Sequence, residues 1–528
     1  MLSSFIKKGL FLFFFVVAFP LAAEKLVIYH TSDIHGYYFP RPNKEEKHIG
    51  GFAVLEQVLR QEKTPFVLLD SGDFSSGNKE ANLSDGRYSV ELMNRAGNSS
   101  LNMSGQGYAA LTIGNHDSDF GAETLAKTLS EFKGDILAAN LENLPLKGKT
   151  TLPYKIYVWN GIRVAVIGYA LDGPGMTGGM TVHSLHQTQW KTLLKEVHSH
   201  NPQAVILLAH DSVADARKPS QIIANLSPVL GENYQIDVFL GGHAHALKTQ
   251  RYLGESGPLF VESASMLEGV NRIELDFDDE TGKLKNTSAR FIPLLLDVWG
   301  EEPETKAKLD EIEDKSLRAP YATVPVLLPK YPQGSDASPD LAKLMADQIK
   351  KWIFSQEKVD FAFFQLPGVR RDVLPGVLTG RDLAELLPYT EYISTFNIKG
   401  KQLKKAAEES IKCSPDGTNF SLFAYSSNIE IEYQCRPFKK ETAKITNMKI
   451  NGKKLSSRKI YRAAGLSHIP DGYFEGAPFK IKKNAQKKIY KKTSGEILFD
   501  IIKELPGEFY QDKQLLAPND VRIKEKKI

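Results

Sequence analysis

Residues 110–119 read ALTIGNHDSD, an apolar run followed at once by side chains that can bind a metal ion or transfer a proton. The apolar run Ala110–Ile113 predicts a buried strand. In α/β proteins, ligand-binding loops converge beyond the carboxyl ends of the strands. The stretch therefore predicts an α/β domain whose functional site lies at its strand ends.

Four other short motifs share this design, because each places a polar cluster after an apolar run: SDIHG, SGDF, LAHD and GGHAH. Alternate residues of an extended loop, such as Asp33 and His35, can face the same ion. A carboxylate at Asp73 can bridge two ions through its two oxygens. The five motifs supply seven predicted metal ligands, which are Asp33, His35, Asp73, Asn115, His210, His243 and His245.

This ligand set predicts a site for two divalent metal ions. Two such ions activate water and hold a phosphoryl group, so the residues favour a metal-dependent phosphoesterase. Oxygen and imidazole ligands without thiolates suit Mn, Zn, Co, Ni or Fe, and the sequence does not choose among these metals.

His116 lies beside a predicted ligand and three residues before Asp119. A histidine held by this carboxylate can stabilise charge on a phosphate and protonate the leaving oxygen. The alternative is that both side chains only stabilise the loop by hydrogen bonds. The neighbouring metal ligands favour the catalytic interpretation.

The N-terminus has the pattern of a secretory signal peptide, with Lys7 and Lys8 before an apolar run that ends in small residues at Ala23. A membrane anchor is the alternative, but Pro20 and a run shorter than the ~20 residues of a spanning helix favour cleavage. Cleavage after Ala23 removes two lysines and no acids, which lowers the net charge from +4 to +2. We therefore expect a periplasmic or extracellular protein without stable membrane insertion.

The remaining 505 residues (528 minus 23) are too many for one core. Strands and helices alternate in residues 24–298, a charged helix-prone linker covers 299–323, and a second domain of mixed strands and helices covers 324–528. Cys413 and Cys435 could pair in an oxidising compartment, and two unpaired thiols are the alternative. The strands predicted in the first domain are residues 26–29, 66–69, 110–113, 164–167, 205–208, 238–240 and 259–261.

The first domain resembles the 5′-nucleotidase family, because SDIHG, SGDF, TIGNHDSDFG, LAANLEN, GIRVAVIGYA, LLAHD and FLGGHAH follow in that family's order. The resemblance implies a four-layer calcineurin-like sandwich, in which two mixed sheets are flanked by helices. It implies His116 and Asp119 as the catalytic pair, with His245 where some relatives have glutamine. It assigns Asp33, His35, Asp73 and His245 to one metal, and Asp73, Asn115, His210 and His243 to the other.

The second domain resembles the family's α+β substrate-binding domain more loosely. By that resemblance Gln365 stands at a position that contacts the base, and Arg370 at one that contacts phosphate. Tyr389 replaces a phenylalanine that stacks on the base. A tyrosine offers a stacking face and an arginine binds phosphate oxygens bidentately, whereas the alternatives are a core aromatic and a surface ion pair.

HIPDGYF, residues 468–474, resembles a second substrate motif of the family with residues deleted. Asp471 keeps the aspartate of that motif. His468 is the nearest candidate for its second stacking aromatic. These differences from the family's motifs affect the prediction of the substrate more than the prediction of the reaction.

The leading hypothesis is hydrolysis of nucleoside 5′-monophosphates to nucleoside and phosphate, in nucleotide catabolism or salvage. A 2′,3′-cyclic nucleotide phosphodiesterase and a UDP-sugar hydrolase are alternatives in the same class. A thiosulfohydrolase of sulfur oxidation is an alternative of another class, and the full ligand set disfavours a non-catalytic binding module. We expect a small nucleotide as partner, no nucleic acid, and a monomer or weak oligomer.

Overall fold

The computed structural model describes residues 25–526 except 44, 46, 160, 172–179, 213–220, 232–233, 252–256, 325–339, 371, 389–390, 414–418, 436–442, 472–485 and 505–520. The predicted signal peptide, residues 1–23, lies outside the described residues. None of the helices within these ranges is both long and apolar enough to cross a bilayer.

The first domain contains a six-stranded sheet in the order β16-β15-β1-β4-β5-β6. Strands β1, β4, β5 and β6 are parallel, whereas β15 is antiparallel to β1 and β16. The sheet is therefore mixed. Its strands are β1 (Lys25–Thr31), β4 (Phe66–Asp70), β5 (Ala110–Leu111), β6 (Asp135–Ile136), β15 (Gly269–Phe277) and β16 (Leu284–Pro293).

A second six-stranded sheet has the order β13-β14-β12-β11-β9-β8. Its four central strands are parallel and both edge strands are antiparallel, so this sheet is mixed too. Its strands are β8 (Tyr154–Trp159), β9 (Ile162–Tyr169), β11 (Ala204–Ala209), β12 (Val238–Gly241), β13 (Lys248–Arg251) and β14 (Leu259–Glu262).

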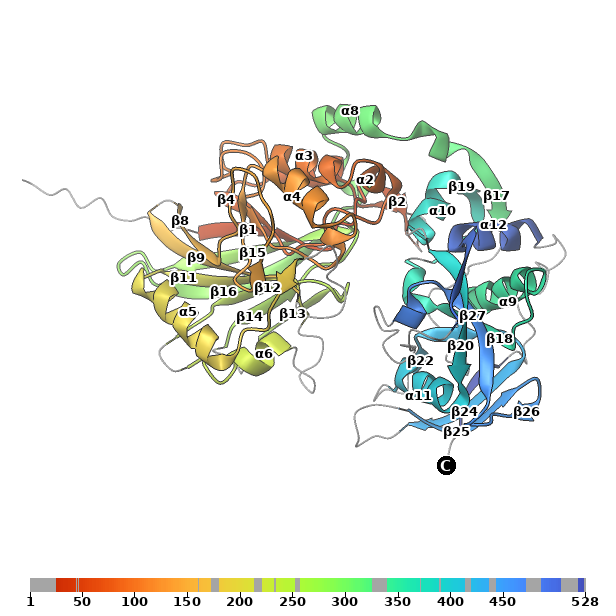
Figure 1. The fold of residues 1–528 in the computed structure, drawn as a ribbon. Helices are drawn as coiled ribbons and strands as arrows, with labels where there is room; N and C mark the ends of the chain where they lie inside the picture. The colour runs from red at the N-terminus through yellow and green to blue at the C-terminus, as the bar shows by residue number, and fades with distance from the viewer. Residues whose placement is uncertain are drawn as a thin grey trace, which may run out of the picture.

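The two sheets pack face to face and helices cover their outer faces (Figure 1). Residues 26–29 of strand β1 are continuously apolar, and the packing of this strand explains why. Ile28 faces the second sheet, whereas Val27 and Tyr29 face the helices, so both sides of the strand are buried. The outer helices are α1 (Phe52–Arg60), α3 (Arg87–Arg95) and α4 (Ala122–Ser130) on the first sheet, and α5 (Gln187–Ser199) and α6 (Gln221–Leu226) on the second. The predicted four-layer sandwich is confirmed.

A connecting segment leaves the first domain through α7 (Leu296–Trp299) and α8 (Pro303–Ile312) and runs across the top of Figure 1. Helix α8 is not a free linker, because its buried Leu309 belongs to the same apolar cluster as α1. The segment continues through a 3-10 turn at Lys315–Arg318 into β17 (Pro320–Val324), which pairs with β19 (Gly376–Thr379).

The second domain is built on a five-stranded sheet, β23-β18-β27-β20-β28, and a four-stranded sheet, β26-β25-β24-β29, which share one apolar core with the helix α9. Its helices are α9 (Asp340–Phe354), α10 (Gly380–Leu386), α11 (Gly400–Ser410) and α12 (Ser494–Glu504). The sheet strands are β18 (Phe361–Gln365), β20 (Tyr392–Lys399), β23 (Phe423–Tyr425), β24 (Ile429–Cys435), β25 (Ala443–Ile450), β26 (Lys453–Lys454), β27 (Ile460–Leu466), β28 (Lys488–Thr493) and β29 (Ile523–Glu525).

Cys413 and Cys435 form a disulfide, which is one of the two alternatives that the sequence left open. Cys435 is the last residue of β24, and Cys413 follows the short strand β21 (Ile411–Lys412). The bridge therefore closes the segment that contains β23 and most of β24.

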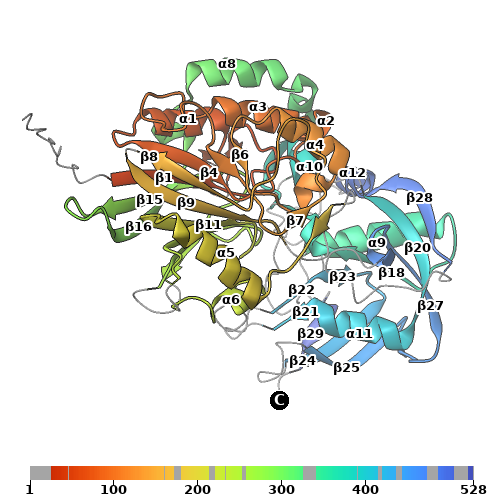
Figure 2. The ribbon, with the colours of Figure 1, turned by 60° about the vertical axis from the view of Figure 1, so that its left-hand side comes forward.

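The two domains meet at α2 (Lys79–Leu83) of the first and α10 of the second, which lie close together in both views (Figure 1, Figure 2). Arg381 of α10 donates to the buried Glu80 of α2 at 2.6 Å. It also reaches Glu313 of the connecting segment at 3.3 Å and lies 4.4 Å from the ring centre of Phe39. One arginine thus contacts both domains and the segment between them.

Candidate metal centre

The predicted ligand loops have an unusual backbone. Five of the seven predicted ligands have φ in the left-handed region, namely Asp33 at 52°, His35 at 50°, Asp73 at 57°, His243 at 77° and His245 at 56°. Each such residue costs about 1 kcal/mol or more, and strain of this kind collects at functional sites.

Glycines allow two of these loops to approach each other. A Cβ on Gly114 would lie 2.2 Å from Asp73 Oδ1, and a Cβ on Gly72 would lie 2.5 Å from the backbone nitrogen of Gly114. Only glycine therefore fits at either position. The SGDF and GNHD motifs form one packed unit rather than two independent loops.

One group of predicted ligands consists of Asp33, His35 and His245, whose ligand atoms lie within 4.8 Å of one another. His35 Nδ1 donates to the carbonyl of Ser76 at 2.8 Å, which leaves the lone pair on Nε2. That nitrogen faces His245 Nε2 at 3.2 Å. Two imidazole nitrogens this close need a cation or a proton between them, and Asp33 Oδ1, 3.4 Å from His245 Nε2, adds a negative ligand.

A second group consists of Asp33, Asp73 and His210. His210 Nδ1 donates to the carbonyl of Ser71 at 2.7 Å, and its Nε2 lies 3.2 Å from Asp73 Oδ2. This Nε2 is buried and makes no hydrogen bond within the described part of the chain. An orphaned ring nitrogen that points at a carboxylate fits a metal ligand.

Asp73 belongs to the second group, and its Oδ2 also lies 3.7 Å from His35 Nε2 of the first, whereas Asp33 belongs to both groups. The bridging role expected for Asp73 stays a prediction. Asn115 Oδ1 and His243 Nδ1 lie 3.1 Å apart, and the backbone nitrogen of His243 donates to Asp33 Oδ2 at 3.0 Å. The structure thus brings all seven predicted ligands together.

His210 and Asp73 each shift the pKa of the other. Burial lowers the pKa of His210, but the attraction of Asp73 outweighs burial and raises that pKa to about 10. Burial raises the pKa of Asp73, yet His210 holds it well below its usual range.

His116 and Asp119 form the expected pair, with His116 Nδ1 3.0 Å from Asp119 Oδ2. Ser76 Oγ donates to the same carboxylate oxygen at 2.8 Å, which keeps Asp119 in place. Burial lowers the pKa of His116, but Asp119 and Asp73 outweigh it, so the pKa lies above its ordinary value. The backbone nitrogen of His116 donates to Asp73 Oδ1 at 2.7 Å.

Arg370 of the second domain reaches this pair across the domain boundary. Its Nη2 lies 3.4 Å from His116 Nε2. This arginine follows β18 and is held there by a hydrogen bond from its backbone nitrogen to the carbonyl of Leu386 at 3.0 Å. A residue predicted to contact phosphate therefore lies beside the predicted catalytic histidine.

Asp117 is a residue that the sequence interpretation missed. Its buried carboxylate accepts four backbone N–H groups, from Asp73 at 2.9 Å, Phe74 at 2.9 Å, Ser75 at 3.0 Å and Gly114 at 2.8 Å. Burial, with the nearby Asp73, raises the pKa of Asp117 to about 7. Asp117 thereby ties the loop of the bridging carboxylate to the loop of Asn115. Its position inside the motif GNHDSD was the only available signal.

The other predicted substrate residues lie in the second domain. Gln365 and His468 contact each other at 2.7 Å, and His468 also contacts Glu391, which the sequence interpretation did not include. Asp471 is exposed and pairs with Lys487 at 2.5 Å. Tyr389 lies outside the described residues.

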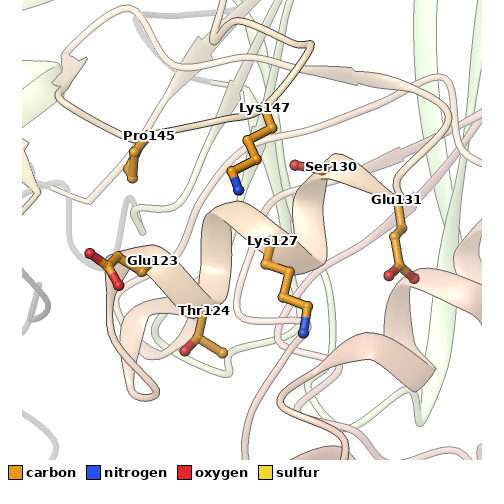
Figure 3. A pocket seen from close by; sticks show the side chains of 7 residues that line it. All are labelled: Glu123, Thr124, Lys127, Ser130, Glu131, Pro145 and Lys147. Carbon is orange, nitrogen blue, oxygen red and sulfur yellow. The ribbon is translucent and has the colours of Figure 1, made fainter.

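A surface hollow of about 710 Å³ opens between α4 and the segment that contains Pro145 and Lys147 (Figure 3). Lys127 and Glu123 of α4 contribute to its lining. None of the predicted ligands or substrate residues that the structure describes lines it, so we do not assign the hollow to the site.

A family model described as calcineurin-like phosphoesterase matches residues 26–247, and one described as 5′-nucleotidase, C-terminal domain, matches residues 325–476. The protein UshA of Yersinia enterocolitica is 22% identical over 508 residues, which cover 85% of this chain and 86% of that protein.

Two solved structures from Thermus thermophilus share the fold of the whole chain. A 5′-nucleotidase precursor has a TM-score of 0.75 at 18% identity, covering 95% of this chain and 99% of that chain. The sulfate thiohydrolase SoxB has a TM-score of 0.69 at 16% identity, covering 96% of this chain and 97% of that chain. Because enzymes with two different substrates share it, the fold alone does not select a substrate.

Proposed function

The chain belongs to the 5′-nucleotidase family of metallophosphoesterases, and from that premise we propose that it hydrolyses nucleoside 5′-monophosphates to nucleoside and phosphate. The observation that carries this proposal is the position of Arg370. Its guanidinium comes from the second domain and lies 3.4 Å from His116 Nε2, next to the predicted metal ligands. A phosphoryl group at this place would meet a cation, a proton donor and the metal centre together.

Two divalent ions held by the seven ligands would supply an activated water and neutralise charge on the phosphoryl group. The ligand chemistry fits Mn, Zn, Co, Ni or Fe. Asp33, His35, Asp73 and His245 would hold one ion, and Asp73, Asn115, His210 and His243 the other.

The chain's own residues would bind the phosphate and move the proton. Arg370 would bind phosphate oxygens. His116, with Nδ1–H directed at Asp119, would carry a proton on Nε2 and donate it to the leaving nucleoside oxygen. The raised pKa of His116 favours the protonated form that this role requires.

We further propose that the protein acts outside the cytoplasm. Lys7 and Lys8 precede an apolar run of signal-peptide type, and the Cys413–Cys435 disulfide suits an oxidising compartment. Mass measurement of the protein recovered from culture medium or periplasm tests this, since cleavage after Ala23 predicts a chain that begins at Glu24.

The function is tested by a phosphate-release screen of purified protein, stripped of metal and reloaded with each candidate ion. The panel contains nucleoside 5′-monophosphates, 2′,3′-cyclic nucleotides, UDP-sugars and p-nitrophenyl phosphate, with sulfate release from a thiosulfonate measured in parallel. We expect the highest kcat/KM with a 5′-monophosphate. A clear preference for a cyclic nucleotide, a UDP-sugar or the thiosulfonate would contradict the proposal.

Asp73→Asn is the control variant for the screen. It keeps the size of the side chain and removes its negative charge. Turnover should be abolished while the circular dichroism spectrum stays that of the parent protein. Native turnover with two bound metals in this variant would disprove the role assigned to Asp73.

A further inference from the structure

Glu262 is a buried carboxylate outside the predicted ligand set. It ends β14, and its side chain is shielded from solvent. In the second sheet β14 lies between β12 and β13 (Figure 1). Glu262 is the strand partner of Gly241 in β12 on one side and of Lys248 in β13 on the other. It therefore stands at the base of the loop that joins β12 to β13, residues 242–247.

This loop carries His243 and His245 on a strained backbone. Both have φ in the left-handed region, and such residues persist only where surrounding contacts hold them. The backbone nitrogen of Ala246 donates to Glu262 Oε1 at 3.4 Å. Burial raises the pKa of Glu262 to about 7, and hydrogen bonds from the N–H groups of Ala244 and Ala246 limit the rise. Glu262 thus holds the loop on both sides of His245.

The other carboxylate oxygen of Glu262 reaches the loop of His210. The buried Ser212, two residues after His210, donates from Oγ to Glu262 Oε2 at 2.6 Å. A backbone contact joins the same two loops, because the nitrogen of Gly242 donates to the carbonyl of Asp211 at 3.0 Å. Glu262 therefore ties together the two ligand loops of the second sheet.

We propose that Glu262 is a positioning residue, which holds the loop of His243 and His245 against the loop of His210 and thereby sets the affinity of the candidate centre for divalent ions. This inference rests on the proposed two-metal hydrolysis and names the group that aligns the ligands of the second sheet. Asp117 joins the ligand loops of the first sheet in the same way, by accepting N–H groups with a buried carboxylate. Loss of a partner of this kind typically costs about 10- to 100-fold in metal affinity.

The test measures Zn²⁺ binding to the purified protein stripped of metal, by competition with a chromogenic chelator. Glu262→Leu should weaken binding about 10- to 100-fold, because the N–H of Ala246 and the hydroxyl of Ser212 lose their acceptor. Glu262→Gln should bind Zn²⁺ as the parent does. Its amide oxygen can accept from Ala246, and its amide N–H can donate to Ser212 Oγ.

Ser212→Ala is a smaller change, and it decides the test if Glu262→Leu does not fold. The variant loses the contact of 2.6 Å and keeps the hydrogen bond from Ala246. Zn²⁺ binding should weaken about three- to tenfold, the effect of one lost hydrogen bond.

Glu56→Leu is the matched control. Glu56 is also a buried carboxylate, and it accepts from the backbone nitrogens of Gly97 at 2.6 Å and Asn98 at 3.1 Å. It belongs to α1, which covers the outer face of the first sheet. The variant should lower the unfolding temperature of the metal-free protein and leave its Zn²⁺ affinity unchanged.

The outcomes are distinct. Parent-like binding by folded Glu262→Leu, or by Ser212→Ala where Glu262→Leu does not fold, would overturn the positioning role, and so would an equal loss in Glu56→Leu. Binding by Glu262→Gln as weak as that of Glu262→Leu would make the charge of Glu262 decisive instead of its hydrogen bonds, which also contradicts the role. A parent protein that binds two Zn²⁺ ions but hydrolyses no nucleotide would reject the proposed function and leave the role of Glu262 standing.

Discussion

At the scale of single residues, the geometry of the candidate metal centre depends on groups that are not predicted ligands. Asp117 accepts four N–H groups from two loops, and the carbonyls of Ser76 and Ser71 set which nitrogen of His35 and His210 is free. Such partners decide where a ligand atom points. The ligands could be predicted because each stands in a recognisable motif after an apolar run. Their partners could not, because the hydrogen bonds join residues that are far apart in the chain.

His116 offers a prediction at this scale. His116→Ala should lower kcat by about 10²–10⁴, the range for a lost acid or base group. Metal content should stay unchanged, because the contact of His116 with Asp73 is made by its backbone nitrogen, which alanine retains. Single-turnover kinetics check the rate, and elemental analysis of the same preparation checks the metal content. If metal is lost together with activity, His116 is a ligand instead.

At the scale of elements, the strands that were predicted are those buried on both faces. Strands β1, β4, β9, β11, β12 and β14 contain the predicted apolar runs, and β5 is shorter than expected, ending at Leu111. Strand β16 was missed. Its sequence LKNTSARFIP is largely polar because it lies at the edge of its sheet. An edge strand forms by pairing with its neighbour, and its own pattern carries little signal.

The disulfide gives a prediction at the same scale. Cys413 and Cys435 are 22 positions apart, and a loop of this size corresponds to about 3 kcal/mol of stabilisation through the unfolded chain. Cys413→Ser combined with Cys435→Ser should lower the free energy of unfolding of the second domain by that amount in urea titrations. Reduction of the parent protein should reproduce the loss, and reductant should not affect the variant. Unchanged stability in both experiments would show that the bridge is dispensable.

At the scale of the whole molecule, the arrangement of the domains depends on contacts that no local pattern encodes. Glu80, Glu313 and Arg381 come from the first domain, the connecting segment and the second domain. They meet because α2 and α10 face each other, with Arg381 bound to the buried Glu80. The sequence predicted two domains and a helical segment between them. It could not predict which surfaces touch, because each of these charges alone is typical of a solvated helix.

Arg381→Ala tests this contact. Loss of the arginine leaves Glu80 buried without its partner, which should destabilise the observed arrangement by about 3 kcal/mol. We expect lower kcat/KM with unchanged metal content, and a larger radius of gyration in solution scattering. Arg318→Ala is the matched control, because Arg318 pairs with the same Glu313 but is 60% exposed, so its loss should cost less than about 1 kcal/mol. Equal effects of the two variants would contradict the interdomain role.

The predicted metal ligands lie far apart in the sequence, so the ribosome synthesises them at different times. Asp33 and His243 contact each other although 210 positions separate them, and they come from opposite sheets of the sandwich. A growing chain thus presents its first ligand long before its last. The complete set exists only after both sheets have formed and docked, whereas the second domain is still to be synthesised. We therefore expect metal uptake to follow the docking of the two sheets and to precede the arrival of Arg370.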